Sequence, residues 1–254
     1  MGRKSQTTKV LSGFECVEPK ILQKLVLKEG ASPYTIASIP IPKDAEYQHM
    51  MITGTTGAGK SNMIHHLLKQ IRNQGDQAII LDTTGGIFAR FFEERTDVYL
   101  NPLDSRSAQW DLWKEAKTDY VIDEIAESII PDTKFMDTFW VQSARQLFKE
   151  SVRFLRDTNQ KTYENLLNMT LKMSLGELKV CIGHTTAAPL LEPSIEKTAL
   201  SVRASLANPL AFLQHLEETG EGLSLLDFMK TNRKTWLFLS CPTDQRALLK
   251  SLFS

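Results

Sequence analysis

The residues best suited to chemistry form one short segment, Gly54-Thr-Thr-Gly-Ala-Gly-Lys-Ser61. This segment matches the pattern G-x-x-x-x-G-K-[ST], in which a glycine-rich loop wraps a phosphate group. The glycines let successive backbone N–H groups point inward, and the N-terminus of the following helix adds partial positive charge. The spacing therefore predicts binding of a nucleoside triphosphate, with Mg-ATP as the expected ligand.

The side chains of this loop have separate expected tasks. Lys60 should reach the β- and γ-phosphates, and the hydroxyl of Ser61 should ligate Mg²⁺. Asp82 follows at the C-terminal end of a predicted strand, where α/β sheets bind ligands, although an aspartate that only forms a turn is as common there. We predict Lys60, Ser61 and Asp82 as catalytic residues and Ser61 as the metal ligand. The predicted nucleotide-binding set is Gly54, Thr55, Thr56, Gly57, Ala58, Gly59, Lys60, Ser61 and Asn62.

The elements that must position the loop follow from apolar spacing. Met50 to Thr53 is a brief apolar run typical of a strand, Gly59 to Asn73 has helical character, and Gln77 to Asp82 reads as a second buried strand. Strand, loop, helix and strand form a βαβ unit, which builds a parallel sheet. Before them, Pro19 to Lys28 is a predicted helix, and the prolines that follow predict turns or edge strands.

Helical spacing replaces strand-like runs in the central part of the chain. Asp137 is a predicted N-cap, Ser174 and Glu177 have the spacing of a capping box, and a further helix is expected from about Ser194 to Asn208. Strand character returns at Thr235 to Cys241. We therefore predict an α/β fold with four parts: a lead-in (1–46), the first part of a nucleotide-binding domain (47–104), an inserted all-α domain (105–219), and the second part of the nucleotide-binding domain (220–254).

A P-loop ATPase also needs an apolar strand that ends in an acidic pair, which holds the metal and polarises water. The one candidate is Val121-Ile122-Asp123-Glu124, but its apolar residues continue at helical spacing to Ile129, which favours a helix. We therefore expect the acidic strand to lie beyond Ser254. The chain as given should then be incomplete for hydrolysis.

The composition narrows the possible partners. Thirty Lys and Arg residues balance thirty Asp and Glu residues, so any contact with DNA must be local. No run of about 18 or more apolar residues is present. Cys16, Cys181 and Cys241 lack the paired spacing of metal sites or disulfide frameworks.

Longer stretches resemble a known family. Three of them resemble TraD/TrwB-type coupling proteins of conjugative type IV secretion: Gln48-His-Met-Met-Ile52, Leu81-Asp-Thr-Thr-Gly-Gly-Ile-Phe88, and Asn101-Pro-Leu-Asp104 leading to Trp110-Asp-Leu-Trp113. Phe139-Trp140, Ile195 to Arg203, and Trp236 to Ser240 resemble the family as well. The resemblance covers nearly the whole chain.

The resemblance implies a RecA-like nucleotide-binding domain with an inserted all-α domain, which couples ATP hydrolysis to the pumping of single-stranded DNA. It implies a homo-hexamer at the cytoplasmic face of the bacterial inner membrane, with relaxosome and secretion-channel proteins as partners. Family members carry N-terminal transmembrane helices, so we expect membrane contact only through a segment absent here. Gly86 stands where many relatives have an acidic residue. The alternatives are a non-catalytic adaptor that binds nucleotide or partners, and another DNA-pumping P-loop ATPase.

Three further features have a functional and a structural interpretation. Trp110 and Trp113 suit stacking on single-stranded bases, but we expect them to pack in a core. Arg203 could contact DNA or a neighbouring subunit's nucleotide, but a solvated or salt-bridged arginine is expected. The basic side chains between Arg145 and Arg156 are expected to form a solvated helix face.

Overall fold

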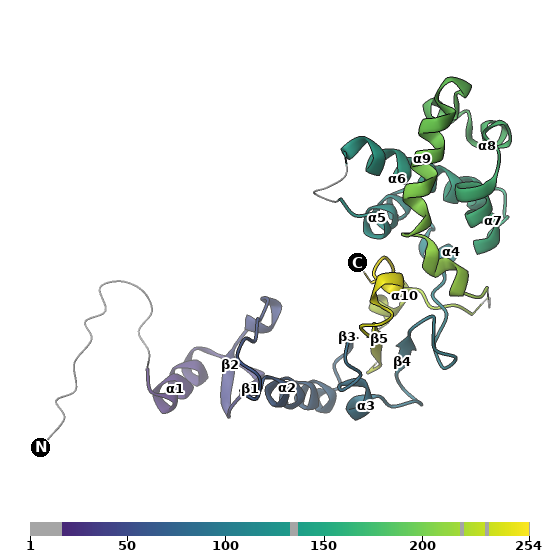
Figure 1. Cartoon of the computed structure of the whole chain (residues 1–254). Coiled ribbons are helices and arrows are strands. Elements are labelled where there is room, and N and C mark those ends of the chain that lie inside the picture. Colours follow the sequence, from purple (N-terminus) through teal and green to yellow (C-terminus); the bar gives the residue numbers. More distant parts are fainter. Residues whose placement is uncertain (1–16, 133–136, 219–220, 232–233, 254) are drawn as a thin grey trace, which may run out of the picture. The chain divides into compact units, whose positions relative to one another are not determined.

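The computed structural model describes residues 17–132, 137–218, 221–231 and 234–253. It divides into two compact units, residues 1–76 and 77–254 (Figure 1). The four-part division predicted from the sequence stays a prediction. Within the described ranges, no helix combines the length and the apolar content that crossing a bilayer requires.

The first unit combines helices with a small hairpin. Helix α1 (Pro19–Glu29) precedes the antiparallel strands β1 (Ala31–Ile36) and β2 (Ile39–Pro42), so the predicted helix and edge strands are confirmed. The two-residue turn between these strands has positive φ at both positions, 48° and 67°, which is the geometry of a type I′ hairpin. The short 3₁₀ helix η1 (Ala45–Tyr47) and then helix α2 (Lys60–Gln74) follow.

One amide side chain fastens α2 to the edge of the hairpin. The backbone N–H of Thr35 donates to Oε1 of Gln70 at 2.8 Å, and Nε2 of Gln70 donates to the carbonyl of Thr35 at 3.0 Å. The side chain thereby replaces a neighbouring strand. The helix ends at Gly75, whose φ of 78° is the left-handed geometry that favours glycine at this position.

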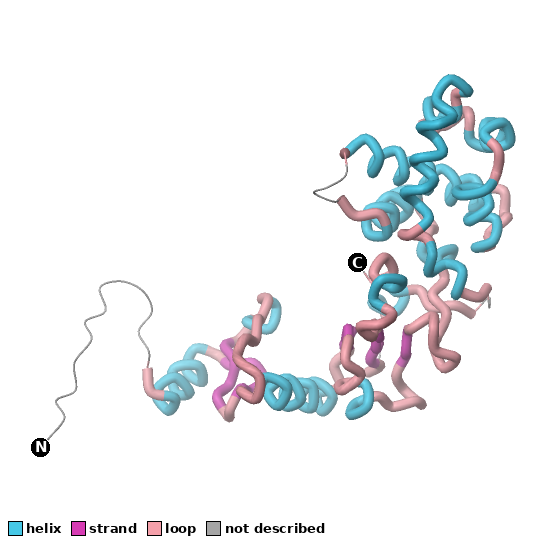
Figure 2. Tube along the Cα trace, viewed as in Figure 1, coloured by secondary structure: helices cyan, strands magenta, loops and turns pink. Residues whose placement is uncertain are grey.

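A three-stranded parallel sheet lies in the second unit (Figure 2). The strands are β3 (Ala78–Asp82), β4 (Val98–Leu100) and β5 (Trp236–Ser240), in the order β3-β5-β4. Strand β5 is central and almost wholly buried, which explains its continuous apolar run. On β3, Ile80 is buried, whereas Ile79 and Leu81 on the opposite face are about half exposed.

The predicted strand at Met50 to Thr53 is wrong. No described residue in this run belongs to a strand, and the side chain of Met51 is 85% exposed. An apolar run becomes a strand only when its backbone pairs with a neighbour. In the first unit the β1 edge of the hairpin, next to α2, is occupied by Gln70, so this edge offers the run no ladder.

Helices fill the sequence between β4 and β5, as predicted, and those from α5 to α9 gather into one body, while α10 lies beside β5 (Figure 1). Most of them carry side-chain caps, and the capping box at Ser174 and Glu177 is confirmed. Helix α3 (Phe88–Phe91) precedes β4. The remaining elements are α4 (Leu112–Glu115), α5 (Asp119–Ile129), α6 (Thr138–Asp157), α7 (Tyr163–Leu167), the π-helical turn η2 (Asn168–Lys172), α8 (Leu175–Ile182), the 3₁₀ helices η3 (Ala188–Leu191), η4 (Pro193–Ile195) and η5 (Ala211–His215), α9 (Glu196–Ala207), α10 (Leu225–Lys230) and α11 (Arg246–Leu249).

The core of the all-α part is organised around α6. Ala144, Phe148 and Leu155 lie on its buried face and are at most 1% exposed. The helix packs against α5 and α9. The segment that leads into the all-α part and the segment that leads out of it lie side by side, because Trp110 pairs with Leu223 in an isolated parallel bridge. Trp110 is 5% exposed, so its predicted role in core packing is confirmed.

Candidate functional site

The phosphate loop adopts a curled backbone at the start of α2. Gly57 and Gly59 have φ of 80° and 89°. A Cβ atom at either position would meet nothing within 4 Å, so the requirement for glycine there is conformational. The N–H of Ala58 donates to the carbonyl of Thr55 at 3.2 Å and closes the turn. Residues 53–59 are exposed, so the loop is open to a ligand.

The N-terminus of α2 has no side-chain cap, which it shares with α1 and α9 but not with most α-helices of the second unit. In the second unit, side chains of Asp, Thr or Ser accept from first-turn N–H groups at the starts of α4, α5, α6, α7, α8 and α10. Helix α2 begins after Gly59, which has no side chain to offer. Its first-turn donors are therefore available to an external anion.

Lys60 rests on the loop that it is expected to serve. Its Nζ donates to the carbonyl of Gly54 at 2.8 Å and to that of Thr55 at 2.7 Å. The ammonium group thus lies against the curl of the backbone. A phosphate that enters the loop would meet a cation already held at the correct place.

The chemistry of the donor set fits a magnesium ion that is held partly by the nucleotide. Ser61 is exposed at the first turn of α2. No group of three or more His, Cys, Asp or Glu side chains that could hold a metal occurs among the described residues. Mg²⁺ binds through few protein ligands together with substrate phosphates, so one serine hydroxyl beside a phosphate loop suits it. Cys181 and Cys241 are free thiols, and Cys16 lies outside the described residues.

Asp82 belongs to the second unit and organises the turn that follows β3. Its Oδ1 accepts from the N–H of Thr84 at 3.0 Å and of Gly85 at 2.9 Å. Its Oδ2 accepts from the N–H of Ile87 and of Phe88, each at 2.8 Å, at the start of α3. These bonds occupy both oxygens, so the geometry favours the turn-forming role over the catalytic one. The catalytic role of Asp82 stays a prediction.

The same hydrogen bonds set the charge state of Asp82. Burial acts to raise the pKa of this carboxyl group, because it penalises the charged form. The donors from Phe88, Thr84 and Gly85 outweigh burial, and the pKa is lowered from its usual value. Asp82 is therefore a carboxylate at neutral pH and cannot donate a proton there.

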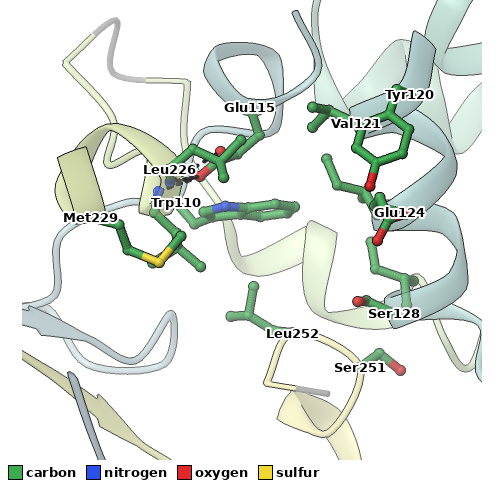
Figure 3. Close-up of a pocket in the computed structure, with 13 residues that line it drawn as sticks. Trp110, Glu115, Tyr120, Val121, Glu124, Ser128, Leu226, Met229, Ser251 and Leu252 are labelled. Atoms are coloured by element: carbon green, nitrogen blue, oxygen red, sulfur yellow. Dashed lines mark hydrogen bonds between the residues drawn. The ribbon is translucent and has the colours of Figure 1, made fainter. Parts of the chain in front are cut away.

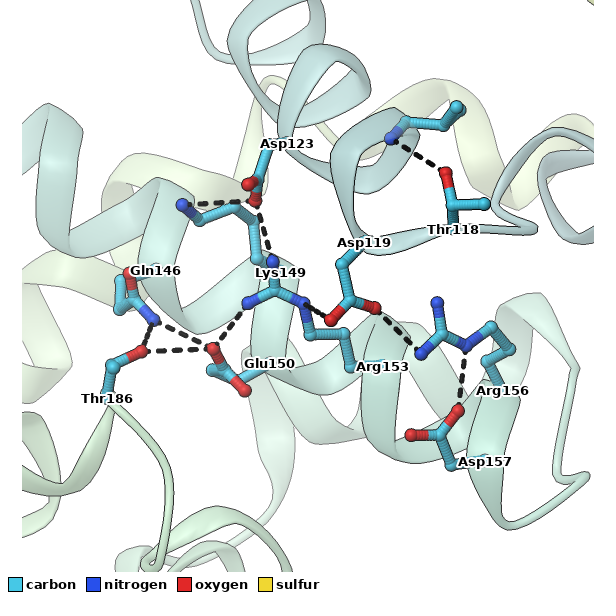
Figure 4. Close-up of polar contacts among 11 residues, drawn as sticks. Thr118, Asp119, Asp123, Gln146, Lys149, Glu150, Arg153, Arg156, Asp157 and Thr186 are labelled. Atoms are coloured by element: carbon cyan, nitrogen blue, oxygen red, sulfur yellow. Dashed lines mark hydrogen bonds and ion pairs between the residues drawn. The ribbon is translucent and has the colours of Figure 1, made fainter.

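The expected solvated basic face on α6 is wrong. The guanidinium of Arg153 pairs with Asp123 at 2.8 Å and with Glu150 at 2.7 Å (Figure 4). Lys149 also pairs with Asp123, and Arg156 pairs with Asp119 and Asp157. The acidic partners come mainly from α5, which confirms that the Val121 to Glu124 segment is helical. Asp123 of that segment, together with Asp119, joins α5 to α6.

Arg203 also differs from expectation, because it is buried and forms no ion pair with the residues that the structure describes. It is 8% exposed on α9, and its Nε and Nη2 atoms have no hydrogen-bond partner among the described residues. Burial lowers the pKa of this guanidinium. Helical spacing alone gave no signal of this burial, because the partners that cover Arg203 come from other helices.

A separate apolar pocket of about 430 Å³ lies in the second unit (Figure 3). Side chains from α5, α10 and the C-terminal segment line it, and the ring of Trp110 forms part of its wall. The Nε1 atom of Trp110 is buried and has no hydrogen-bond partner in the described part of the chain. The carboxylate of Glu115 is satisfied by the N–H groups of Leu225 and Leu226. The pocket contains none of the residues predicted for nucleotide binding.

The family follows from comparison with known proteins. Residues 33–254 match the family model described as the type IV secretion-system coupling protein DNA-binding domain. The chain belongs to this family. It is also 35% identical over 262 residues to coupling protein TraD of Escherichia coli (strain K12), a match that covers 100% of this chain and 36% of TraD.

Solved structures of the plasmid coupling protein TrwB share the fold of this coupling-protein domain. TrwB in complex with the non-hydrolysable ATP analogue ADPNP is 25% identical, with a TM-score of 0.83, over 98% of this chain and 61% of TrwB. TrwB in complex with ADP and Mg²⁺ gives the same coverage and TM-score at 24% identity. These matches confirm the predicted α/β class with a RecA-like P-loop domain and an all-α domain. The chain spans about a third of TraD and about three fifths of the TrwB chains.

Proposed function

We propose that this coupling-protein domain binds Mg-ATP through residues 54–62 and forms the nucleotide-binding core of a motor that transfers single-stranded DNA in conjugation. The observation that carries the proposal is the loop itself. Two glycines with left-handed φ curl the backbone, Lys60 lies within the curl, and α2 has no side-chain cap. The complexes of TrwB with ADPNP and with ADP and Mg²⁺ support the same ligand.

Each residue of the loop has a defined part in this proposal. The backbone N–H groups from Gly54 to Asn62 enclose the phosphates, and the first turn of α2 adds its free donors. Lys60 exchanges its bonds to the loop carbonyls for bonds to the β- and γ-phosphates. Ser61 supplies the protein's ligand to Mg²⁺. Asp82 shapes the turn after β3. The catalytic role that we still propose for Asp82 is to position a water molecule bound to the metal.

The wider assignment rests on the family. Its description as a DNA-binding domain supports DNA as a partner. We assign the segment 105–219 as an all-α domain inserted between residues 47–104 and 220–254. In the intact protein we propose a homo-hexamer at the cytoplasmic face of the bacterial inner membrane, which works with relaxosome and secretion-channel proteins.

Nucleotide titration tests the central claim. Isothermal titration with Mg-ATP should give saturable binding to the native chain, and Lys60→Ala should weaken it by at least about 10-fold, the loss of one charge-assisted contact. Lys69→Ala is the matched control, because Lys69 is exposed on the same helix α2 but lies outside the loop. Its affinity should equal that of the native chain.

Two results would contradict the proposal. The first is the absence of saturable Mg-ATP binding by a chain whose circular dichroism shows that it is folded. The second is equal binding by the Lys60→Ala and native chains, which would favour an adaptor that uses another surface.

A further inference from the structure

Helix α1 packs on the hairpin with one face, and its opposite face exposes lysine and apolar side chains. Val26 is 7% exposed, and Nε2 of Gln23 donates to the carbonyl of Ser38 at 3.4 Å, so these residues mark the inward face. At 100° per residue, the opposite face is centred on Ile21 and Lys28. The packing of α1 against β2 therefore fixes which residues face outward.

The outward face carries a row of lysines. Lys20, Lys24 and Lys28 follow one another at intervals of four residues, so they lie along one side of α1. All three are exposed, and the structure records no ion pair between them and the described residues. Residues 1–29 contain six Lys or Arg against three Glu in a chain whose net charge is zero.

A row of apolar side chains runs beside the lysines. Ile21 is 52% exposed and Leu25, one turn later, is 45% exposed, while Leu22 is 39% exposed. A basic row beside an exposed apolar row is the pattern of a helix that lies in the interface of an anionic bilayer. The lysines would also favour binding to nucleic acid, but leucine and isoleucine side chains would add no affinity for its charged backbone.

We infer that α1 binds the surface of an anionic lipid bilayer, with Ile21 and Leu25 entering the headgroup region and the three lysines pairing with lipid phosphates. This assignment differs from the expectation that membrane contact occurs only through a segment absent from this sequence, and that expectation stays a prediction. It is independent of nucleotide binding. The hairpin holds α1 by its opposite face, so the contact needs no rearrangement of the first unit.

Vesicle sedimentation of the whole chain tests the inference. The native chain should sediment with vesicles of phosphatidylcholine that contain roughly 30% phosphatidylglycerol, and not with phosphatidylcholine alone, because lysines respond to anionic surface charge. The triple variant Lys20→Gln, Lys24→Gln, Lys28→Gln should bind on the order of 100-fold more weakly, at roughly fivefold for each lysine. The variant Ile21→Ser, Leu25→Ser should also lose binding.

The matched control removes three exposed lysines from the all-α part: Lys161→Gln, Lys172→Gln and Lys197→Gln. It should bind anionic vesicles as the native chain does. Lys60→Ala should do so too, which separates this inference from the nucleotide site. Failure of the native chain to sediment with anionic vesicles overturns the inference, and so does an equal loss in the control. If the α1 lysine variant lost binding to a single-stranded oligonucleotide but kept vesicle binding, α1 would be a DNA contact instead.

Discussion

A Cβ atom built on Gly222 would lie 2.5 Å from the Cβ of Asp111, closer than real side chains approach. The two residues lie where the chain leaves and enters the all-α part. Around them, the N–H of Asp111 donates to the carbonyl of Leu223 at 2.9 Å, and Nζ of Lys114 donates to the carbonyl of Gly222 at 3.0 Å. The absence of a side chain at Gly222 thus permits the close approach of the two chain segments that the Trp110–Leu223 bridge joins.

Gly222→Ala should destabilise the protein by about 1–3 kcal/mol, because the methyl group must push Asp111 away or open the pairing. Urea unfolding followed by tryptophan fluorescence measures the change. Gly176→Ala is the matched control, since a Cβ on Gly176 in α8 meets nothing within 4 Å. It should leave stability equal or raise it by about 0.5–1 kcal/mol. Equal stability of Gly222→Ala and the native chain would contradict the close contact.

Arg203→Met should stabilise the second unit by roughly 1–3 kcal/mol. Methionine keeps much of the volume while removing a buried charge whose Nε and Nη2 lack partners among the described residues. Arg145→Met should have the opposite effect, because the Nε of Arg145 donates to the carbonyl of Ile130 at 2.8 Å and its guanidinium pairs with Asp132. Thermal unfolding of both variants shows whether each melting temperature rises or falls relative to that of the native chain. A lower melting temperature for Arg203→Met would mean that its guanidinium is satisfied in solution.

Asp82→Asn should cost roughly 1–3 kcal/mol, since an amide cannot accept from donors on both sides of the carboxylate and leaves half-buried N–H groups unpaired. The pKa of Asp82 is lowered in the folded state. Its stabilisation is therefore fully present above the unfolded pKa of about 3.9 and is lost as the pH falls through the lower folded value.

Urea unfolding of the native chain and of Asp82→Asn between about pH 2 and pH 7 measures this dependence, and the variant should show a shallower loss in acid. Identical slopes for the two proteins would show that the carboxylate of Asp82 is not held by these hydrogen bonds.

Ser61→Ala should remove most of the gain in ATP affinity that Mg²⁺ provides, by roughly 10-fold, while binding without Mg²⁺ changes little. Titrations with and without the metal separate the two effects. Ser61→Thr keeps a hydroxyl at the same position and should retain the response to Mg²⁺. If Ser61→Ala kept the full response, the serine would not be the ligand.

The features that the sequence predicted well are those with local signals. The curled backbone at Gly57 and Gly59 follows a contiguous glycine pattern. The helix caps at Asp137 and Ser174 depend on residues three or fewer positions away, and the central strand β5 is marked by a continuous apolar run. Each of these signals lies inside the element that it specifies. Neighbouring residues were therefore enough to predict them.

The features that sequence analysis predicted wrongly depend on residues that are far away in the sequence. From its sequence neighbours Arg153 is predicted to be an exposed cation. In the structure it pairs with Asp123 of α5, which lies 30 residues away in sequence. Arg203 reads as a surface residue until other helices bury it. Met50 to Thr53 has the composition of a strand, but a strand forms only where a second strand is placed to pair with its backbone. None of these outcomes can be read from the residue and its nearest neighbours.

The pairing order β3-β5-β4 has a consequence for the order of folding. The first two of these strands along the chain, β3 and β4, must await a partner that follows the entire all-α segment. Contacts between residues so far apart form late, whereas neighbouring helices meet early. Pulse-labelled refolding should therefore protect the amides of α6 before those of β5. During synthesis on the ribosome, the side chain of Ile80, which is buried in the folded protein, would stay exposed on a strand with two free edges. A chaperone would have most to do in this period.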